Sequence, residues 1–173
     1  MINIPLALQQ INFAAFVSLM QAVSWLGNEP QIFLLITAFV LALLFLNLRR
    51  EAFFLAVNGI GVYILGTLIK LIVQRPRPPS SLLHDWSFPS GHVLSFVACF
   101  GFLAYLAYTF LPRSLRRTIL LSFLVGLIIL VGVSRIYLGD HWASDVFGSY
   151  LLGVVWLLFM IGFYNQRHDK IGK

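Results

Sequence analysis

The chain has 173 residues, of which 60% are hydrophobic and only 10% are charged, and its mean hydropathy is +0.89. Soluble domains carry about 25% charged residues, so this composition excludes an ordinary soluble protein and makes lipid the solvent. The net charge of +6 is typical of basic membrane-protein loops, and we expect no nucleic-acid binding because the sequence has no basic–aromatic motif. The single cysteine, Cys99, excludes a disulfide framework.

The first segment, residues 4–26, is uncharged and long enough to cross a bilayer. Its polar residues nevertheless fall roughly along one helical face: Gln10, Ser18, Gln21, Ser24 and Asn28. This pattern favours an amphipathic helix in the membrane interface over residues 1–27, with a membrane-crossing helix as the alternative.

Apolar stretches near the length of a membrane-spanning helix, about 20 residues, follow along the chain. The predicted spans are Gln31–Leu48, Ala52–Val73, Val93–Leu111, Thr118–Val133 and Ala143–Tyr164. Because unpaired strands would leave backbone groups unsatisfied in lipid, we predict an all-α integral membrane bundle of five or six transmembrane helices. It forms one domain over residues 28–166, followed by a short tail at 167–173 that we expect in the cytoplasm.

The distribution of basic residues predicts the orientation. Eight of the twelve Lys and Arg residues fall on one side of the five spans, and four fall on the other. The positive-inside bias places the eight in the cytoplasm. The remaining four are Lys70, Arg75, Arg77 and Arg135. They lie in the most polar stretches of the chain, which we therefore expect on the extracytoplasmic face.

The basic residues of these stretches predict a phosphate site. Lys70 ends one span, Arg77 lies in a proline-rich segment and Arg135 ends another span. Guanidinium groups pair bidentately with phosphate oxygens, and lysine acts as a movable point charge. Ser90 and Gly91 stand where a span begins, so their backbone N–H groups are expected to point at an anion. Snorkelling to the interface explains Lys70 or Arg135 alone, but it does not explain the whole set.

Two histidines and a carboxylate add acid–base chemistry. His141 and Asp145 are four residues apart at the start of the last span, so they share a face if that turn is helical. A carboxylate there can hold one imidazole nitrogen and leave the other for attack on an electrophile. His92 follows the phosphate cradle directly and is placed to protonate a leaving oxygen.

Metal binding is the alternative for these polar residues. The donors would be His84, Asp85, His92, Asp140, His141 and Asp145. The surrounding cations would repel a metal ion, and no HExxH-like spacing occurs. We therefore expect neither a metal nor another cofactor.

Three motifs together resemble the signature of the type 2 phosphatidic acid phosphatase (PAP2) superfamily. They are Lys-x6-Arg-Pro at Lys70–Pro78, Pro-Ser-Gly-His at Pro89–His92, and Ser-Arg-x5-His-x3-Asp at Ser134–Asp145. The resemblance covers about residues 25–165, and because the chain is short at its N-terminus we expect it to lack the first of the six spans common in the family. Soluble vanadium haloperoxidases share the signature, but this composition is that of a membrane protein.

The resemblance implies a metal-independent phosphatase with His141 as nucleophile, Asp145 orienting it and His92 as general acid and base. Phosphate would be held by Lys70, Arg77, Ser90, Gly91 and Arg135. The implied substrate is a phosphorylated lipid of a bacterial inner membrane: phosphatidylglycerophosphate, undecaprenyl pyrophosphate or lipid A 1-phosphate. A lipid phosphotransferase of the same family and a non-enzymatic phospholipid binder are the alternatives.

Overall fold

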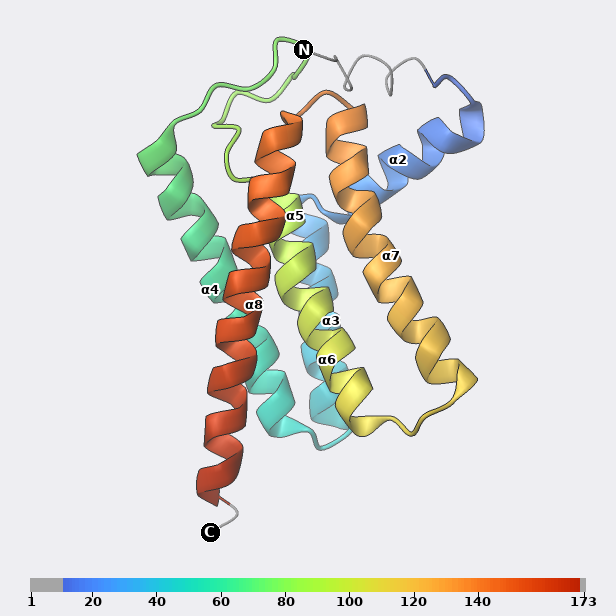
Figure 1. Cartoon of the computed structure of the whole chain (residues 1–173), viewed down its shortest axis with the longest axis vertical. Coiled ribbons are helices and arrows are strands. Elements are labelled where there is room, and N and C mark those ends of the chain that lie inside the picture. The colour runs from blue at the N-terminus through green and yellow to red at the C-terminus, as the bar shows by residue number, and fades with distance from the viewer. Residues whose placement is uncertain (1–10, 172–173) are drawn as a thin grey trace.

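The computed structural model describes residues 11–171, and side chains are described for residues 11–166. Residues 4–10 of the predicted N-terminal helix lie outside this range. The described chain is helical throughout its regular structure and runs in this order: α2 (Ala14–Leu26), α3 (Glu29–Phe45), α4 (Arg49–Val73), α5 (Gly91–Ser95), η1 (Phe96–Phe100), α6 (Gly101–Phe110), α7 (Leu115–Tyr137) and α8 (Ala143–Ile171). Figure 1 shows these helices aligned as an elongated bundle, with α2 turned across one end.

The predicted helical membrane bundle is confirmed. Four stretches are long and apolar enough to cross a membrane: Arg49–Val73, Gly91–Phe110, Leu115–Tyr137 and Ala143–Gln166. The pair α2 and α3 is the fifth candidate, because together the two helices pass the same test, although their axes differ by 68°. Alone, the 13 residues of α2 extend only about 20 Å, which is less than the hydrocarbon thickness. The described residues therefore hold up to five crossings.

Prolines and polar caps set the helix ends. Helix α4 stops at Gln74, which adopts a left-handed conformation with φ 48°, two residues before Pro76. Helix α6 ends before Pro112, and the Ser114 side chain accepts a hydrogen bond from the Arg117 N–H at the start of α7. The prediction that the next span ends at Val133 is four residues too short. Helix α7 continues to Tyr137 because Arg135, which looks like a boundary in the sequence, is buried among polar partners.

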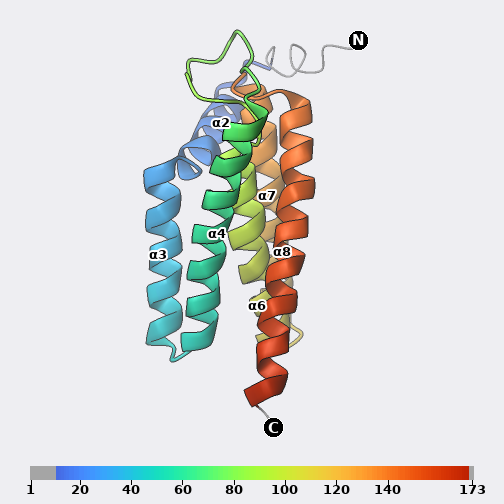
Figure 2. The ribbon, with the colours of Figure 1, turned by 90° about the vertical axis from the view of Figure 1, so that its left-hand side faces the viewer.

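The middle of the bundle is fixed by a polar clamp. The Asn58 side-chain amide donates to the Ala98 carbonyl over 2.7 Å and accepts from the Trp156 indole over 2.8 Å. Ala98 lies in the π-helical turn η1, where the wider helical turn weakens the regular hydrogen-bond ladder. The clamp joins α4 and α8 to the helix that begins at Gly91. Figure 2 shows α4 between α3 and α8, with the irregular segment 74–90 above the ends of the helices.

Candidate active site

The three sequence motifs meet at one end of the bundle. The segment 74–90 passes over the turn between α7 and α8 and is fastened to it by several bonds. Ser80 Oγ donates to the Gly139 carbonyl over 3.0 Å, and the Trp142 indole donates to the Pro76 carbonyl over 3.0 Å. Gly139 has φ 74°, a left-handed conformation that glycine adopts without strain and that turns the chain toward α8. This turn places His141 under the segment that carries Arg77.

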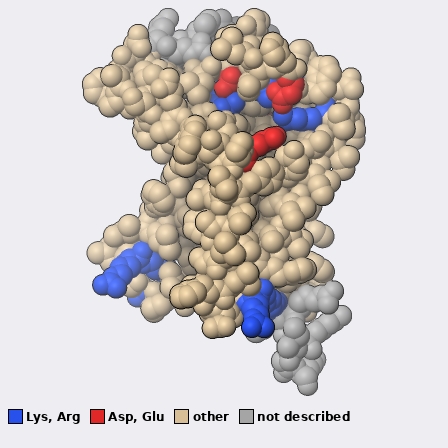
Figure 3. Space-filling view, turned by 180° about the vertical axis from the view of Figure 1, so that it is seen from behind, with Lys and Arg blue, Asp and Glu red and all other residues tan. Residues whose placement is uncertain are grey.

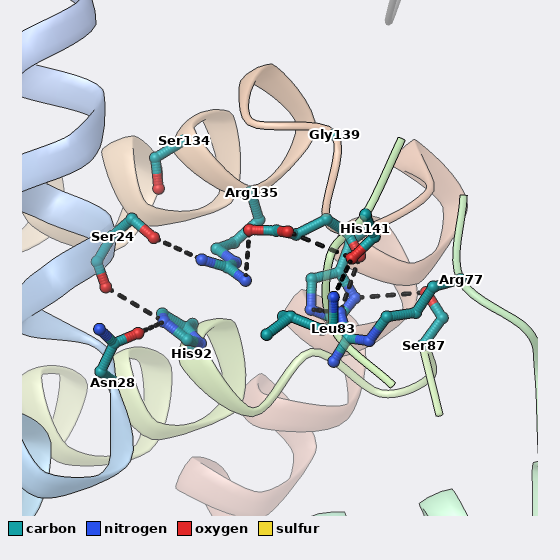
Figure 4. Close-up of polar contacts among 12 residues, drawn as sticks. Ser24, Asn28, Arg77, Leu83, Ser87, His92, Ser134, Arg135, Gly139 and His141 are labelled. Atoms are coloured by element: carbon teal, nitrogen blue, oxygen red, sulfur yellow. Dashed lines mark hydrogen bonds and ion pairs between the residues drawn. The ribbon is translucent and has the colours of Figure 1, made fainter. Parts of the chain in front are cut away.

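The imidazole of His141 is buried and has one partner on each nitrogen (Figure 4). Nε2 lies 3.1 Å from Arg77 Nη1, and Nδ1 lies 3.4 Å from Ser87 Oγ. Because a guanidinium can only donate, Nε2 must carry the lone pair, and the proton therefore resides on Nδ1. Burial, together with the positive charges of Arg77 and Arg135, lowers the pKa of His141 to about 2. The ring is thus a neutral base with its lone pair directed at the cations.

Asp145 reaches His141 through an intermediary. The Asp145 carboxylate is fully buried and accepts from Ser87 Oγ over 2.5 Å, and the same hydroxyl faces His141 Nδ1. Asp145 also pairs with Arg75. We expected the carboxylate to hold the imidazole directly from one helical turn away. His141 instead precedes α8 and Asp145 lies inside it, so Ser87 lies between them.

Three of the predicted phosphate ligands converge from separate elements. Lys70 and Arg77 both pair with the Asp85 carboxylate, Arg77 at 2.6 Å. Arg135 pairs with Asp140 at 2.8 Å, and only 3% of it is exposed. Burial opposes ionisation of Asp85, but Lys70 and Arg77 outweigh it and hold the pKa of that carboxyl below its usual value. Each cation is therefore oriented by a carboxylate.

The Pro-Ser-Gly-His motif begins the helix that runs from Gly91. The Ser90 backbone N–H donates to Ser149 Oγ over 2.8 Å, and Ser149 Oγ donates to the Asp145 carbonyl over 2.6 Å. Ser90 is fully buried, whereas Gly91 and His92 line the cavity of the site. The Ser90 hydroxyl is buried without a hydrogen-bond partner within residues 11–166. Because Ser90 is fully buried and is not among the residues that line the cavity, it lies behind the cavity wall.

One cavity of about 390 Å³ connects the motif residues to the lipid-facing helices. Its polar end is lined by Lys70, Arg77, His92, Arg135 and His141. Its apolar walls come mainly from α3 and α4 and include Phe33, Ile36, Val62 and Tyr63. A ligand in this cavity would place an anionic group among the cations and an apolar group between the helices. The predicted residues other than Ser90 and Asp145 thus lie on the cavity wall.

Several polar residues of the site were missing from the predicted set. Arg75 and Ser87 contact Asp145, while Ser24 and Asn28 contact Arg135 and His92. Arg75 lies inside the first motif and Ser87 lies two residues before the second, so their positions were a usable signal. Ser24 and Asn28 lie more than 40 residues before the first motif, and their polar face is equally typical of the interfacial helix that the sequence predicts. Across residues 11–166, no three His, Cys, Asp or Glu side chains converge as metal ligands.

A membrane-spanning helical bundle with a cation-lined cavity and two histidines has the architecture of a membrane phosphoryl-transfer protein. The sequence model of the PAP2 superfamily matches residues 51–169, and the chain belongs to this superfamily.

Individual relatives agree with this assignment. Phosphatidylglycerophosphatase B of Bacillus subtilis (strain 168) is 32% identical over 108 residues, covering 60% of this chain and 53% of the relative. An undecaprenyl-diphosphatase of Sulfolobus acidocaldarius is 29% identical over 159 residues, covering 87% of this chain and 72% of the relative. The chain thus spans about half the length of the first of these proteins.

Two crystal structures share the fold. The transmembrane PAP2-type phosphatidylglycerolphosphate phosphatase from Bacillus subtilis has a TM-score of 0.83 at 25% identity, covering 94% of this chain and 83% of that chain. Aquifex aeolicus LpxE has a TM-score of 0.68 at 20% identity, covering 90% of this chain and 91% of that chain.

Proposed function

We propose that this protein is a lipid phosphatase that transfers the phosphoryl group of a membrane lipid to His141 and then to water. One observation carries the proposal: the His141 Nε2 lone pair faces Arg77 in a cavity that also holds Lys70 and Arg135. A nucleophile and an anion site on one wall, with an apolar wall beside them, suit a phosphate attached to a lipid.

The residues divide the reaction into two steps. In the first, His141 Nε2 attacks phosphorus, the bond to the leaving oxygen breaks, and that oxygen takes a proton from His92. In the second, His92 removes a proton from water, the water oxygen bonds to phosphorus, and the P–N bond to His141 breaks. Lys70, Arg77 and Arg135 balance the charge on the phosphoryl oxygens in both steps.

The position of Ser87 explains how a buried imidazole can become a phosphorylated cation. His141 Nδ1–H donates to Ser87 Oγ, which donates to the Asp145 carboxylate. When Nε2 bonds to phosphorus the ring gains positive charge, and this chain of donors places a negative charge behind it. We therefore assign to Asp145 and Ser87 the joint role of fixing the tautomer and stabilising the phosphohistidine.

The proposed substrate is a phosphorylated lipid of the cell envelope. Phosphatidylglycerophosphate, undecaprenyl pyrophosphate and lipid A 1-phosphate share the required chemistry, a terminal phosphate on a large apolar group. The apolar cavity wall between α3 and α4 suits the lipid portion. The segment 79–88 is too short to fold into a separate cap over the site, which leaves room for a bulky substrate.

The test is phosphate release from purified samples of these lipids by the purified protein in excess EDTA. We expect release to persist in the chelator and to be blocked by vanadate, which mimics the transferring phosphoryl group. An acid-labile, alkali-stable phosphoprotein should be trapped from labelled lipid, and His141→Gln should not form it. Loss of activity in EDTA that Mg²⁺ restores would overturn the mechanism. Transfer of label to a second lipid would instead identify a phosphotransferase, and binding without turnover would identify a lipid carrier.

We further propose that the site faces the outside of a bacterial inner membrane. Basic residues gather at both ends of the bundle in Figure 3, but those at the site end pair with acidic residues of the site. The opposite end carries the basic excess that marks the cytoplasmic side. Single cysteines at Ser81 and Ser114 in a Cys99→Ala background test this with a membrane-impermeant thiol reagent. Labelling from outside should modify position 81 and spare position 114, and the reverse would place the chemistry in the cytoplasm.

A further inference from the structure

The break between α2 and α3 forms a sharp elbow beside the proposed active site. The elbow consists of residues 24–28, and the two helices diverge there by 68°. It lies outside residues 51–169, the region that the superfamily model matches. Figure 4 shows Ser24 and Asn28 directed toward His92 and Arg135. Nothing in the three sequence motifs accounts for this contact.

The elbow fixes which nitrogen of His92 carries a proton. His92 Nε2 lies 3.1 Å from the Ser24 carbonyl and 3.2 Å from Asn28 Oδ1. Both oxygens are acceptors, so Nε2 must be the protonated nitrogen. The two ring nitrogens point in widely different directions, and His92 lines the cavity. With Nε2 directed to the elbow, Nδ1 is the nitrogen turned away from it and available for proton transfer.

The Asn28 side chain contacts His92 and does not cap the helix that it precedes. It occupies the N-cap position of α3, where an asparagine side chain usually accepts a hydrogen bond from the helix's first free N–H groups. The Asn28 side chain makes no such cap bond and accepts from the imidazole instead. A residue retained for helix stability alone would cap the helix. The geometry therefore argues for a role at His92.

Gly27 allows the ring to approach the elbow. A Cβ atom built on Gly27 would lie 2.3 Å from His92 Cδ2, closer than real carbon atoms approach. Ser24 adds a second function to the same turn, because its hydroxyl accepts a hydrogen bond from Arg135 while its carbonyl contacts His92. The elbow thus contacts both the proposed acid–base group and one proposed phosphate-binding cation.

We propose that Asn28 and the Ser24 carbonyl are positioning residues for His92. They accept the hydrogen bond from its Nε2–H and so direct Nδ1, the nitrogen that exchanges a proton in the reaction, toward the leaving oxygen. This inference rests on the proposed phosphatase function. As the P–O bond breaks, His92 Nδ1 gives its proton to the leaving oxygen and becomes neutral while Nε2 keeps its own. In the second step, water gives a proton to Nδ1 as its oxygen bonds to phosphorus, and the P–N bond to His141 breaks. The bound phosphate offsets the positive charges of Lys70, Arg77 and Arg135 around the imidazolium.

The test separates positioning of a general acid from a merely structural role by changing the leaving group. An alkoxide leaving group needs a proton, whereas p-nitrophenolate leaves without one. We compare kcat/KM, which reports the steps up to departure of the leaving group, for decyl phosphate and p-nitrophenyl phosphate. Asn28→Leu should lower the value for decyl phosphate about tenfold and leave that for p-nitrophenyl phosphate within threefold. Asn28→Asp, which keeps the acceptor oxygen, should restore the wild-type ratio.

Further variants complete the design. Gly27→Ala should displace the His92 ring and so cause the same selective fall in kcat/KM for decyl phosphate. His92→Ala, which removes the ring, shows the largest fall that this loss can reach. Ser24→Ala keeps the carbonyl but loses the Arg135 contact, so it should lower kcat/KM by the same factor for both substrates. Asn165 accepts a hydrogen bond from Tyr105 in α6, so Asn165→Leu is the matched control and should leave the ratio unchanged.

Two outcomes would overturn the inference: equal losses for both substrates in Asn28→Leu, or no loss for either. Should that variant not elute as a single species, Asn28→Ser, whose shorter side chain cannot reach the ring, is measured instead under the same criteria. A wild-type protein that hydrolyses neither substrate nor any envelope lipid would refute the phosphatase function itself.

Discussion

The two ends of the bundle use arginine in different ways. At the site end, Arg75, Arg77 and Arg135 each form an ion pair with an aspartate. At the opposite end, Arg50 lies 4.1 Å from the centre of the Tyr164 ring and donates to the Tyr164 carbonyl. Arg117 likewise lies over the Tyr108 ring and donates to the Leu111 carbonyl.

This difference fits two uses of one residue type: the proposed chemistry at the site end and anchoring at the opposite end. An aspartate fixes both the position and the charge balance of a cation, which suits a site that must present its donors to an anion. An aromatic ring and a backbone carbonyl only satisfy a cation near the lipid boundary. The sequence left snorkelling open as the alternative role of Arg135, but Arg135 is buried and paired with Asp140. Snorkelling fits Arg50 and Arg117 instead. Substitutions at both ends can test the distinction.

The largest contrast is expected at the nucleophile. His141→Ala should lower kcat at least about 1,000-fold, because the proposed phosphoryl acceptor is lost, while lipid binding stays measurable since the cations remain. Arg117→Ala, at the other end, should change kcat less than twofold. Both are measured as phosphate release from detergent-solubilised lipid. Retention of a tenth of wild-type kcat by His141→Ala would show that His141 is not the nucleophile.

The next test replaces one arginine at each end of the bundle by alanine. Arg135→Ala should lower kcat/KM about 100-fold, the usual size of losing one buried donor to a phosphoryl oxygen. Arg50→Ala should leave kcat/KM within twofold and instead lower the thermal midpoint, because it removes a contact between α4 and α8. Equal effects of the two variants on kcat/KM would contradict the division between the ends.

A smaller effect is expected at Ser87. Ser87→Ala breaks the link between Asp145 and His141, so kcat should fall about tenfold while KM changes little. Ser80→Ala is the matched control, because Ser80 lies in the same segment but bonds to the Gly139 carbonyl. Wild-type kcat in Ser87→Ala would mean that Asp145 orients His141 without help.

The last test concerns stability against pH and does not measure the reaction. The pKa of His141 is about 2 in the folded protein and ordinarily 6.5, so below pH 6.5 the unfolded chain binds a proton that the folded chain does not. Stability is therefore lost as pH falls, by about 2 kcal/mol at pH 5. Asp85 contributes nothing in this range, since its lowered pKa acts below 3.8. The thermal midpoint should fall by several degrees from pH 7 to pH 5, and His141→Asn should make this slope shallower.

The sequence predicted the bundle and most residues of the candidate site because both produce local sequence patterns. Long apolar runs determine the helices, and the three motifs carry the residues that face the cavity. The contact of Ser24 and Asn28 with the site could not be predicted, because a polar face on an apolar helix is also typical of an interfacial helix. The position of Ser87 between Asp145 and His141 depends on how residues 74–90 fold over α8, a tertiary feature that residue spacing does not contain.

Asp85 has a consequence for the resting protein. Its carboxylate pairs with Lys70 and Arg77, the two cations that the proposed substrate would engage. Binding is then an exchange of anions: a phosphate must replace a tethered carboxylate, and the carboxylate competes again at the end of each turnover. A monovalent ion such as chloride is a weak competitor against a carboxylate bound to the same chain, whereas a divalent phosphate is a strong one. The site therefore discriminates by charge before any chemistry begins.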